Sequence, residues 1–128
     1  MAVRIVRLGT ARTEGEGIRI GTVRRPPRGV PKSEFVSQNW YDVWFPNLAP
    51  SVETMKLGQG ASTPAQWAAF VKKYRAEMTT PEISRTLDLL AVLSHQSDFS
   101  VGCYCGNEAH CHRSVLRALL AERGAKIE

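Results

Sequence analysis

Thiol, imidazole and guanidinium groups stand close together near the carboxyl end of the chain. They belong to Cys103, Cys105, Cys111, His110, His112 and Arg113. Thiolates act as nucleophiles and as metal ligands, and imidazole exchanges protons near neutral pH. We therefore expect the functional site in the segment that spans residues 99–124.

A strand, a tight loop and a helix must position these groups. Residues 100–104 have the apolar character of a short buried strand, and Gly106 and Asn107 are typical turn residues. From Cys111 onward the apolar residues follow helical spacing, and Gly124 predicts the end of that helix. In open α/β sheets, ligands bind where a strand ends and the next helix begins, and the helix N-terminus favours an anion.

The first hypothesis is a reactive thiol in this loop. Cys105 is expected at the end of the strand and Cys111 at the start of the helix, whereas Cys103 is expected to be buried and inert. A cysteine at a helix N-terminus, close to Arg113 and the histidines, has a lowered pKa. Cys105 or Cys111 is therefore the candidate catalytic nucleophile and His112 the candidate proton carrier.

The same loop is a candidate anion site. Free backbone N–H groups of residues 106–113, together with Arg113 and Asn107, are expected to hold a phosphate-like or nucleotide-like ligand. The proline-rich segment 24–32, RRPPRGVPK, is expected to bring Arg24 and Arg28 to that ligand. The sequence specifies no cofactor, and it leaves open whether a small anionic ligand is transformed or only bound.

Two alternatives remain. The net charge of +5 and the basic loop 24–32 are also typical of a nucleic-acid-associated accessory protein. The second alternative is a metal-binding module, because the cluster offers more than the four ligands of a tetrahedral zinc ion. Its candidate ligands are Cys103, Cys105, Cys111, His110 and His112.

The order of predicted elements indicates an α/β fold. Strands are expected over residues 3–8 and 17–23, and helices after Thr63-Pro64 and Thr80-Pro81, where Thr-Pro pairs predict helix starts. A last strand is expected over residues 125–127. We predict a single domain over residues 1–128, a Rossmann-like three-layer sandwich with a mostly parallel sheet.

Composition places the chain among ordinary globular proteins, with 43% hydrophobic and 23% charged residues. Apolar runs are too short for a membrane span or a signal peptide, so no membrane partner and a cytoplasmic location are expected. An odd set of three cysteines in nine residues argues against a complete disulfide framework.

Several longer motifs carry a family resemblance. They are RRPPRG at 24–29, YDVWFPNLAPS at 41–51, FVKKYRAEM at 70–78, GCYC at 102–105 and CHRSVLRALLAERGA at 111–125. In these motifs the chain resembles the domain-of-unknown-function family numbered 488, in its YeaO-like branch. The resemblance implies a small bacterial or archaeal cytoplasmic α/β protein of undetermined activity. It also implies a site lined by Cys105, Cys111, His112 and Arg113, approached by Arg28.

The chain departs from that family pattern at two places. Residues 25–28 read Arg-Pro-Pro-Arg where an aromatic Trp-Pro-Arg-Gly turn is usual. Residues 55–60 read MKLGQG where a Trp-Phe-Gly-His-like segment is common. Both departures concern the aromatic and histidine components of the pocket.

Overall fold

The computed structural model describes residues 1–128 and is built around a four-stranded, all-parallel sheet. The strands are β1 (Val3–Arg7), β2 (Ile18–Gly21), β3 (Val43–Trp44) and β4 (Phe99–Cys103). The helices are α1 (Val52–Gln59), α2 (Pro64–Glu77), α3 (Pro81–Leu93) and α4 (His112–Glu122). Short 3₁₀ turns cover η1 (Lys32–Glu34), η2 (Pro46–Leu48) and η3 (Glu108–His110). No helix is long and apolar enough to span a membrane.

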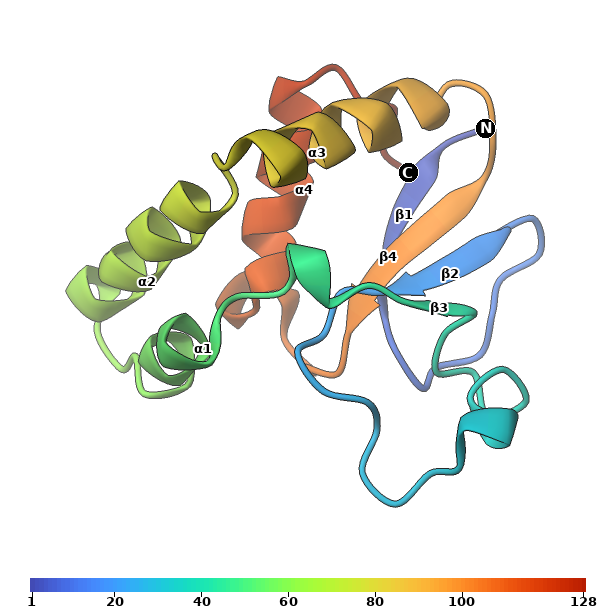
Figure 1. Ribbon diagram of the computed structural model, residues 1–128, viewed down its shortest axis with the longest axis horizontal. Helices are drawn as coiled ribbons and strands as arrows, with labels where there is room; N and C mark the ends of the chain where they lie inside the picture. The colour runs from blue at the N-terminus through green and yellow to red at the C-terminus, as the bar shows by residue number, and fades with distance from the viewer.

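Strand β4 lies inside the sheet, between β1 and β2, in the order β1-β4-β2-β3 (Figure 1). All five of its residues are buried, as expected of a parallel strand that is covered on both faces. In the register, Arg7 of β1 is opposite Cys103, and Gly21 of β2 is opposite Gly102. The carboxyl ends of β1, β2 and β4 therefore meet at one edge of the sheet.

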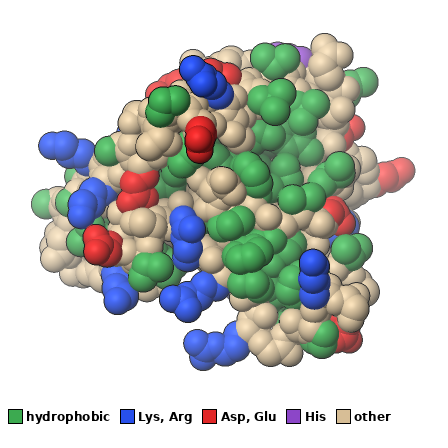
Figure 2. Space-filling view, in the orientation of Figure 1, with side chains coloured by type: hydrophobic (Ala, Val, Ile, Leu, Met, Phe, Trp, Pro, Cys, Tyr) green, Lys and Arg blue, Asp and Glu red, His purple; other side chains and the backbone are tan.

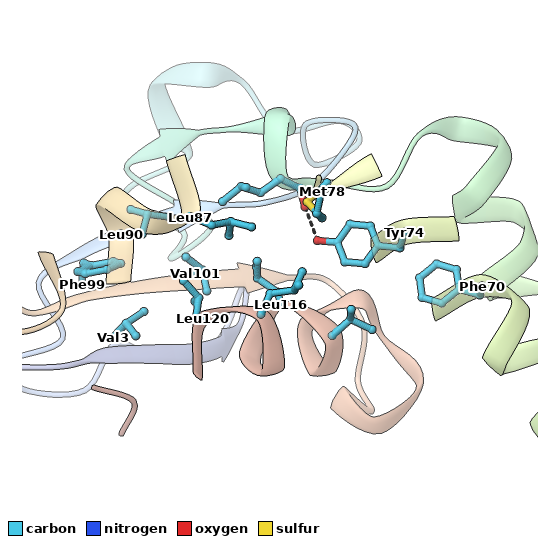
Figure 3. Packing of buried hydrophobic residues seen from close by; sticks show 13 residues of the cluster. Val3, Phe70, Tyr74, Met78, Leu87, Leu90, Phe99, Val101, Leu116 and Leu120 are labelled. Carbon is cyan, nitrogen blue, oxygen red and sulfur yellow. Dashed lines mark hydrogen bonds between the residues drawn. The ribbon is translucent and has the colours of Figure 1, made fainter. Parts of the chain in front are cut away.

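The helices form the main core with one face of the sheet. Phe99 and Val101 of β4 pack in a cluster of 13 buried residues with side chains of α2, α3 and α4, including Tyr74 and Leu116 (Figure 3). The Tyr74 hydroxyl donates a hydrogen bond to the Leu48 carbonyl. This contact ties α2 to the η2 turn that leads into α1.

The opposite face of the sheet carries a buried polar network. Arg19 is fully buried in β2, and its Nε and Nη2 donate to the two carboxylate oxygens of Glu16 at 2.7 and 2.9 Å. Ser100 of β4 donates to the same carboxylate at 2.8 Å. The Arg19 Nη1 donates to the carbonyls of Thr10 and Asn39. The network thus fastens the loop between β1 and β2 onto the sheet.

The predicted α/β class and parallel sheet are confirmed. The Thr63 side chain caps α2 in a capping box, and Gly124 follows α4 with φ +80°. One predicted element is wrong: residues 125–127 form no strand but a single bridge between Ile127 and Val3. The helix predicted after Thr80-Pro81 is present as α3, although Thr80 precedes it without a side-chain capping bond.

We predict that Glu16→Gln lowers the free energy of unfolding by about 3 kcal/mol, because it leaves the buried Arg19 charge without its partner. Burial alone raises the pKa of Glu16, but hydrogen bonds from Arg19 and Ser100 outweigh it and lower the pKa. The stabilisation is therefore present above the pKa of the unfolded carboxyl group and is lost as the pH falls through the folded pKa.

Urea unfolding of the wild type and of Glu16→Gln across the acidic pH range measures this difference in stability. Glu14→Gln, at an exposed position in the same loop, is the matched control and is expected to change stability by less than about 0.5 kcal/mol. Equal stability of the two variants would contradict the structural role given to Glu16.

Candidate functional site

A pocket opens where β2 and β4 end and α4 begins. Its volume is about 260 Å³, and most of its lining is apolar. All three cysteines line it, together with His110 and His112. Its position at the carboxyl ends of parallel strands is the usual place for a ligand in an open α/β sheet.

The three thiols converge in this pocket. The Sγ atoms of Cys103 and Cys105 are 3.7 Å apart. Ligand atoms of Cys103, Cys111 and His112 all lie within 4.8 Å of one another, and all three residues are buried. Cys105 is exposed, and none of the three cysteines forms a disulfide. Cys103 is buried, as expected, and its thiol also belongs to the cluster.

Hydrogen bonding fixes the His112 ring. Its Nε2 lies 2.7 Å from the backbone carbonyl oxygen of Thr22, directly after β2. A carbonyl oxygen can only accept, so Nε2 carries a proton and donates it. Nδ1 is 3.9 Å from the Cys111 Sγ. The ring nitrogen that can accept a proton from Cys111 therefore faces that thiol.

The pKa values of the thiols are driven apart. Hydrogen bonds from Cys103 and Cys105, together with the contact to His112, hold the pKa of Cys111 well below its ordinary value despite burial. The hydrogen bonds to Cys105 and Cys111, with burial, raise the pKa of Cys103. Cys111 is also the N-cap residue of α4, and the partial positive charge of a helix N-terminus stabilises a thiolate there. Cys111 is thus the thiol of the cluster whose ionised form is most favoured.

An aromatic wall closes one side of the pocket. The Trp67 ring stacks on Phe70 at 4.7 Å between centroids, and the His110 ring meets Trp67 edge-on at 5.4 Å. Gly58 of α1 lies against Phe70, where an added Cβ would come within 2.8 Å of the ring. The close approach of α1 and α2 therefore brings these rings to the pocket. His110 is held at this wall rather than within the Cys103–Cys111–His112 cluster.

Two predicted anion-binding residues stabilise the loop backbone. Arg113 is 4% exposed, and its Nη2 donates to the Cys105 carbonyl at 2.7 Å. The Asn107 side chain accepts from the Ala109 N–H and caps the η3 turn. Neither residue lines the pocket. Both hold the loop that carries Cys105 and Cys111.

The basic loop after β2 divides between two hollows. Arg24 lines the pocket, and its guanidinium donates to the carbonyls of Pro50 and Ala49 at 3.0 Å. Arg25 lines it as well and is exposed. Arg28 lies in a second, adjoining hollow. The structure thus brings Arg24 to the thiols but not Arg28.

Three contributors to the site could not be recognised from their local sequence. Trp67 has the spacing of a core residue, and Arg25 stands beside an arginine with the same charge. The Thr22 carbonyl is a backbone group, which every residue type would supply, so the sequence does not mark it. The alternation of Cys103 and Cys105 along a strand was the one available signal that their thiols share a face.

Comparison with known proteins gives one match. The family model described as DUF488-N3a, the active DUF488-N3 subclade, matches residues 3–124. No curated protein and no solved structure matches the chain. The match covers nearly the whole chain, and the chain therefore belongs to the DUF488 family.

We predict that Arg113→Ala lowers the free energy of unfolding by about 2 kcal/mol in the absence of any ligand, because it removes a buried, charged hydrogen bond to the Cys105 carbonyl. Arg117→Ala, one turn further along α4, breaks a partly exposed ion pair with Glu108 and is expected to cost less than about 1 kcal/mol. Chemical denaturation measures both changes. A smaller loss of stability in Arg113→Ala than in Arg117→Ala would contradict the structural role given to Arg113.

Proposed function

We propose that this protein is a thiol-dependent enzyme that acts on a small anionic molecule, with Cys111 as nucleophile and His112 as its proton partner. The observation that carries the proposal is the fixed His112 ring, with Nε2 on the Thr22 carbonyl and Nδ1 facing the Cys111 Sγ. A nucleophile, an adjacent base and a third group that orients the base form the arrangement that activates a cysteine.

The reaction follows from where the proton is held. Transfer of the Cys111 proton to Nδ1 gives a thiolate and an imidazolium. The thiolate attacks an electrophilic centre, and the bond from that centre to its leaving group breaks as His112 returns the proton to the leaving group. A second nucleophile, such as water, then releases the bound group from Cys111 and gives its own proton to His112.

The lining indicates the kind of substrate. Trp67, backed by the buried Phe70, offers apolar surface for a flat or aliphatic body. Arg24 and Arg25 offer positive charge for an anionic group. Arg25 has no hydrogen-bond partner for its side chain within the protein, so its guanidinium is free to bind a ligand. The description of the family model as an active subclade agrees with a site that has a reactive thiol.

We expect Cys111 to be alkylated by iodoacetamide at about pH 6, where an ordinary thiol is protonated. His112→Gln removes the proton acceptor and is expected to move the pH profile of Cys111 alkylation upward by more than one pH unit. His110→Gln, in the same pocket but outside the thiol cluster, is the control and should leave the profile unchanged. Mass analysis of the Cys111 peptide measures the rate. A wild-type profile identical to that of His112→Gln would contradict the proposal.

One observation favours a second candidate function, a zinc centre. Zn–S bonds of about 2.3 Å place tetrahedral thiolates about 3.8 Å apart, and the Cys103 and Cys105 sulfurs are 3.7 Å apart. Ligand atoms of Cys103, Cys111 and His112 lie within 4.8 Å of one another, and Cys105 would be the fourth ligand. The Nε2 bond to Thr22 is the kind of contact that orients a metal-bound imidazole. In this case the thiols would hold the metal and Cys111 would not be free to attack.

Metal content separates the two candidates. The thiol proposal predicts that protein purified without chelator holds less than about 0.1 equivalent of zinc, and that a strong chelator leaves its unfolding temperature unchanged. Stoichiometric zinc, lost in Cys103→Ser together with a fall in stability, is the outcome that the zinc candidate predicts. Cys103 is the residue to change because the proposed enzyme does not use it as a nucleophile.

A further inference from the structure

A second, more open hollow adjoins the thiol pocket. Its volume is about 690 Å³, and ten residues from four separate segments line it. We call it the arginine groove after the residues that characterise it: Arg7, Arg25, Arg28, Trp40 and Tyr104. It lies on the strand-end edge of the sheet, because Arg7 is the last residue of β1 and Tyr104 follows β4.

The positive charge of the groove is not neutralised. Arg7, Arg25 and Arg28 are all exposed, and none of them forms an ion pair. No acidic residue lines the groove. On the face seen in Figure 2, Lys and Arg side chains gather between α1 and the loop that follows β2. A concave surface with unpaired guanidinium groups of one sign attracts phosphates.

Two aromatic rings are fixed among these arginines. Trp40 meets Tyr104 edge-on with 5.8 Å between ring centroids. Trp40 also lies against Gly9, where φ is +88° and an added Cβ would come within 2.8 Å of the ring. The Tyr104 hydroxyl donates to the Arg25 carbonyl at 2.8 Å. The rings are therefore held in place and offer stacking surface beside the positive charges.

The groove is continuous with the thiol pocket. Arg25 and Tyr104 line both hollows. A chain-like ligand that lies in the groove therefore reaches the pocket mouth at these two residues. Trp67 lines the pocket itself, and its indole is the kind of ring that a flat base would stack on.

We propose that the arginine groove binds single-stranded nucleic acid and presents one of its nucleotides to the thiol pocket. Spaced arginines that follow a phosphate backbone, with aromatic rings among them, are the recurring design of sites for single strands. A single phosphate would not require three arginines drawn from two separate segments. The presentation of a nucleotide to Cys111 rests on the proposed thiol function; binding in the groove does not.

The probe is a fluorescent oligothymidylate of about ten nucleotides, the order of length that one such site covers. Fluorescence anisotropy against salt concentration measures its affinity for the full-length protein. The groove variant is Arg7→Ala/Arg28→Ala, which changes two arginines that lie outside the thiol pocket. The control is Lys72→Ala/Lys73→Ala on α2, which removes the same charge at exposed positions. Urea unfolding verifies that both variants are folded.

We expect wild-type binding that weakens steeply with salt. In the groove variant the affinity should fall about tenfold or more, and the slope of log affinity against log salt should decrease by about 1.4 for two lost phosphate contacts. The control should bind like wild type. No binding at low salt, or equal losses in the two variants, would overturn the groove as a binding site.

Alkylation of Cys111 tests whether the bound strand reaches the thiol pocket. Saturating oligothymidylate is expected to slow iodoacetamide alkylation of Cys111 at least fivefold in wild type and not in the groove variant. Tight binding with unchanged Cys111 alkylation would overturn the presentation of a nucleotide to the pocket. Failure of the proposed thiol function is recognised separately, because Cys111 would then be unreactive at about pH 6 without any oligonucleotide. Thymidine monophosphate that protects Cys111 equally well would show that the pocket takes free nucleotides and would overturn the need for a strand.

Discussion

The hydrogen bond from His112 Nε2 to the Thr22 carbonyl is the interaction on which the geometry of the site depends. It joins the first turn of α4 to the residue that directly follows β2. Thr22 is itself tied to β4, because its N–H and its hydroxyl both donate to the Gly102 carbonyl. One short chain of hydrogen bonds therefore connects two strand ends and a helix start. Through it, the position of the Cys111 proton acceptor is set by the sheet rather than by a flexible loop.

The sheet can set that position because it is held differently on its two faces. Apolar side chains of β4 pack under the helices, whereas Arg19, Glu16 and Ser100 form a buried ionic network on the other face. The apolar face contributes most of the burial. The ionic network fixes the β1–β2 loop, and with it the Thr10 and Asn39 carbonyls close to the arginine groove. Because both faces of the sheet are covered, the edge formed by the carboxyl ends of its strands is where an open surface can form.

Local patterns predicted the elements that carry the site. The buried strand was predicted at 100–104 and lies one residue earlier, at 99–103. The helical apolar residues from Val115 to Leu120 are buried, and Gly124 follows the helix, as their spacing indicated. These features are decided by neighbours in sequence, which is why they can be read from it. The proximity of Cys105 and Cys111 to one loop was likewise a consequence of strand-loop-helix order.

The partners of charged side chains could not be read in the same way. Arg113 and Arg28 have the same chemistry, but Arg113 is buried against the Cys105 carbonyl and Arg28 is exposed in the groove. That difference depends on long-range packing, which no spacing within the motif encodes. The same holds for Trp40, which meets Tyr104 from 64 positions away in the sequence.

The proposed chemistry requires that Cys111 is ionised at neutral pH while Cys103 and Cys105 are not. Carbon-13 labelling of the cysteine Cβ atoms and NMR titration of all three resonances measure this directly, with Cys→Ser variants to assign them. We predict a Cys111 resonance in the thiolate position at neutral pH, while Cys103 and Cys105 remain in the thiol position until the pH rises above the ordinary cysteine pKa. Three resonances that titrate together near that ordinary value would show that Cys111 is not the ionised thiol.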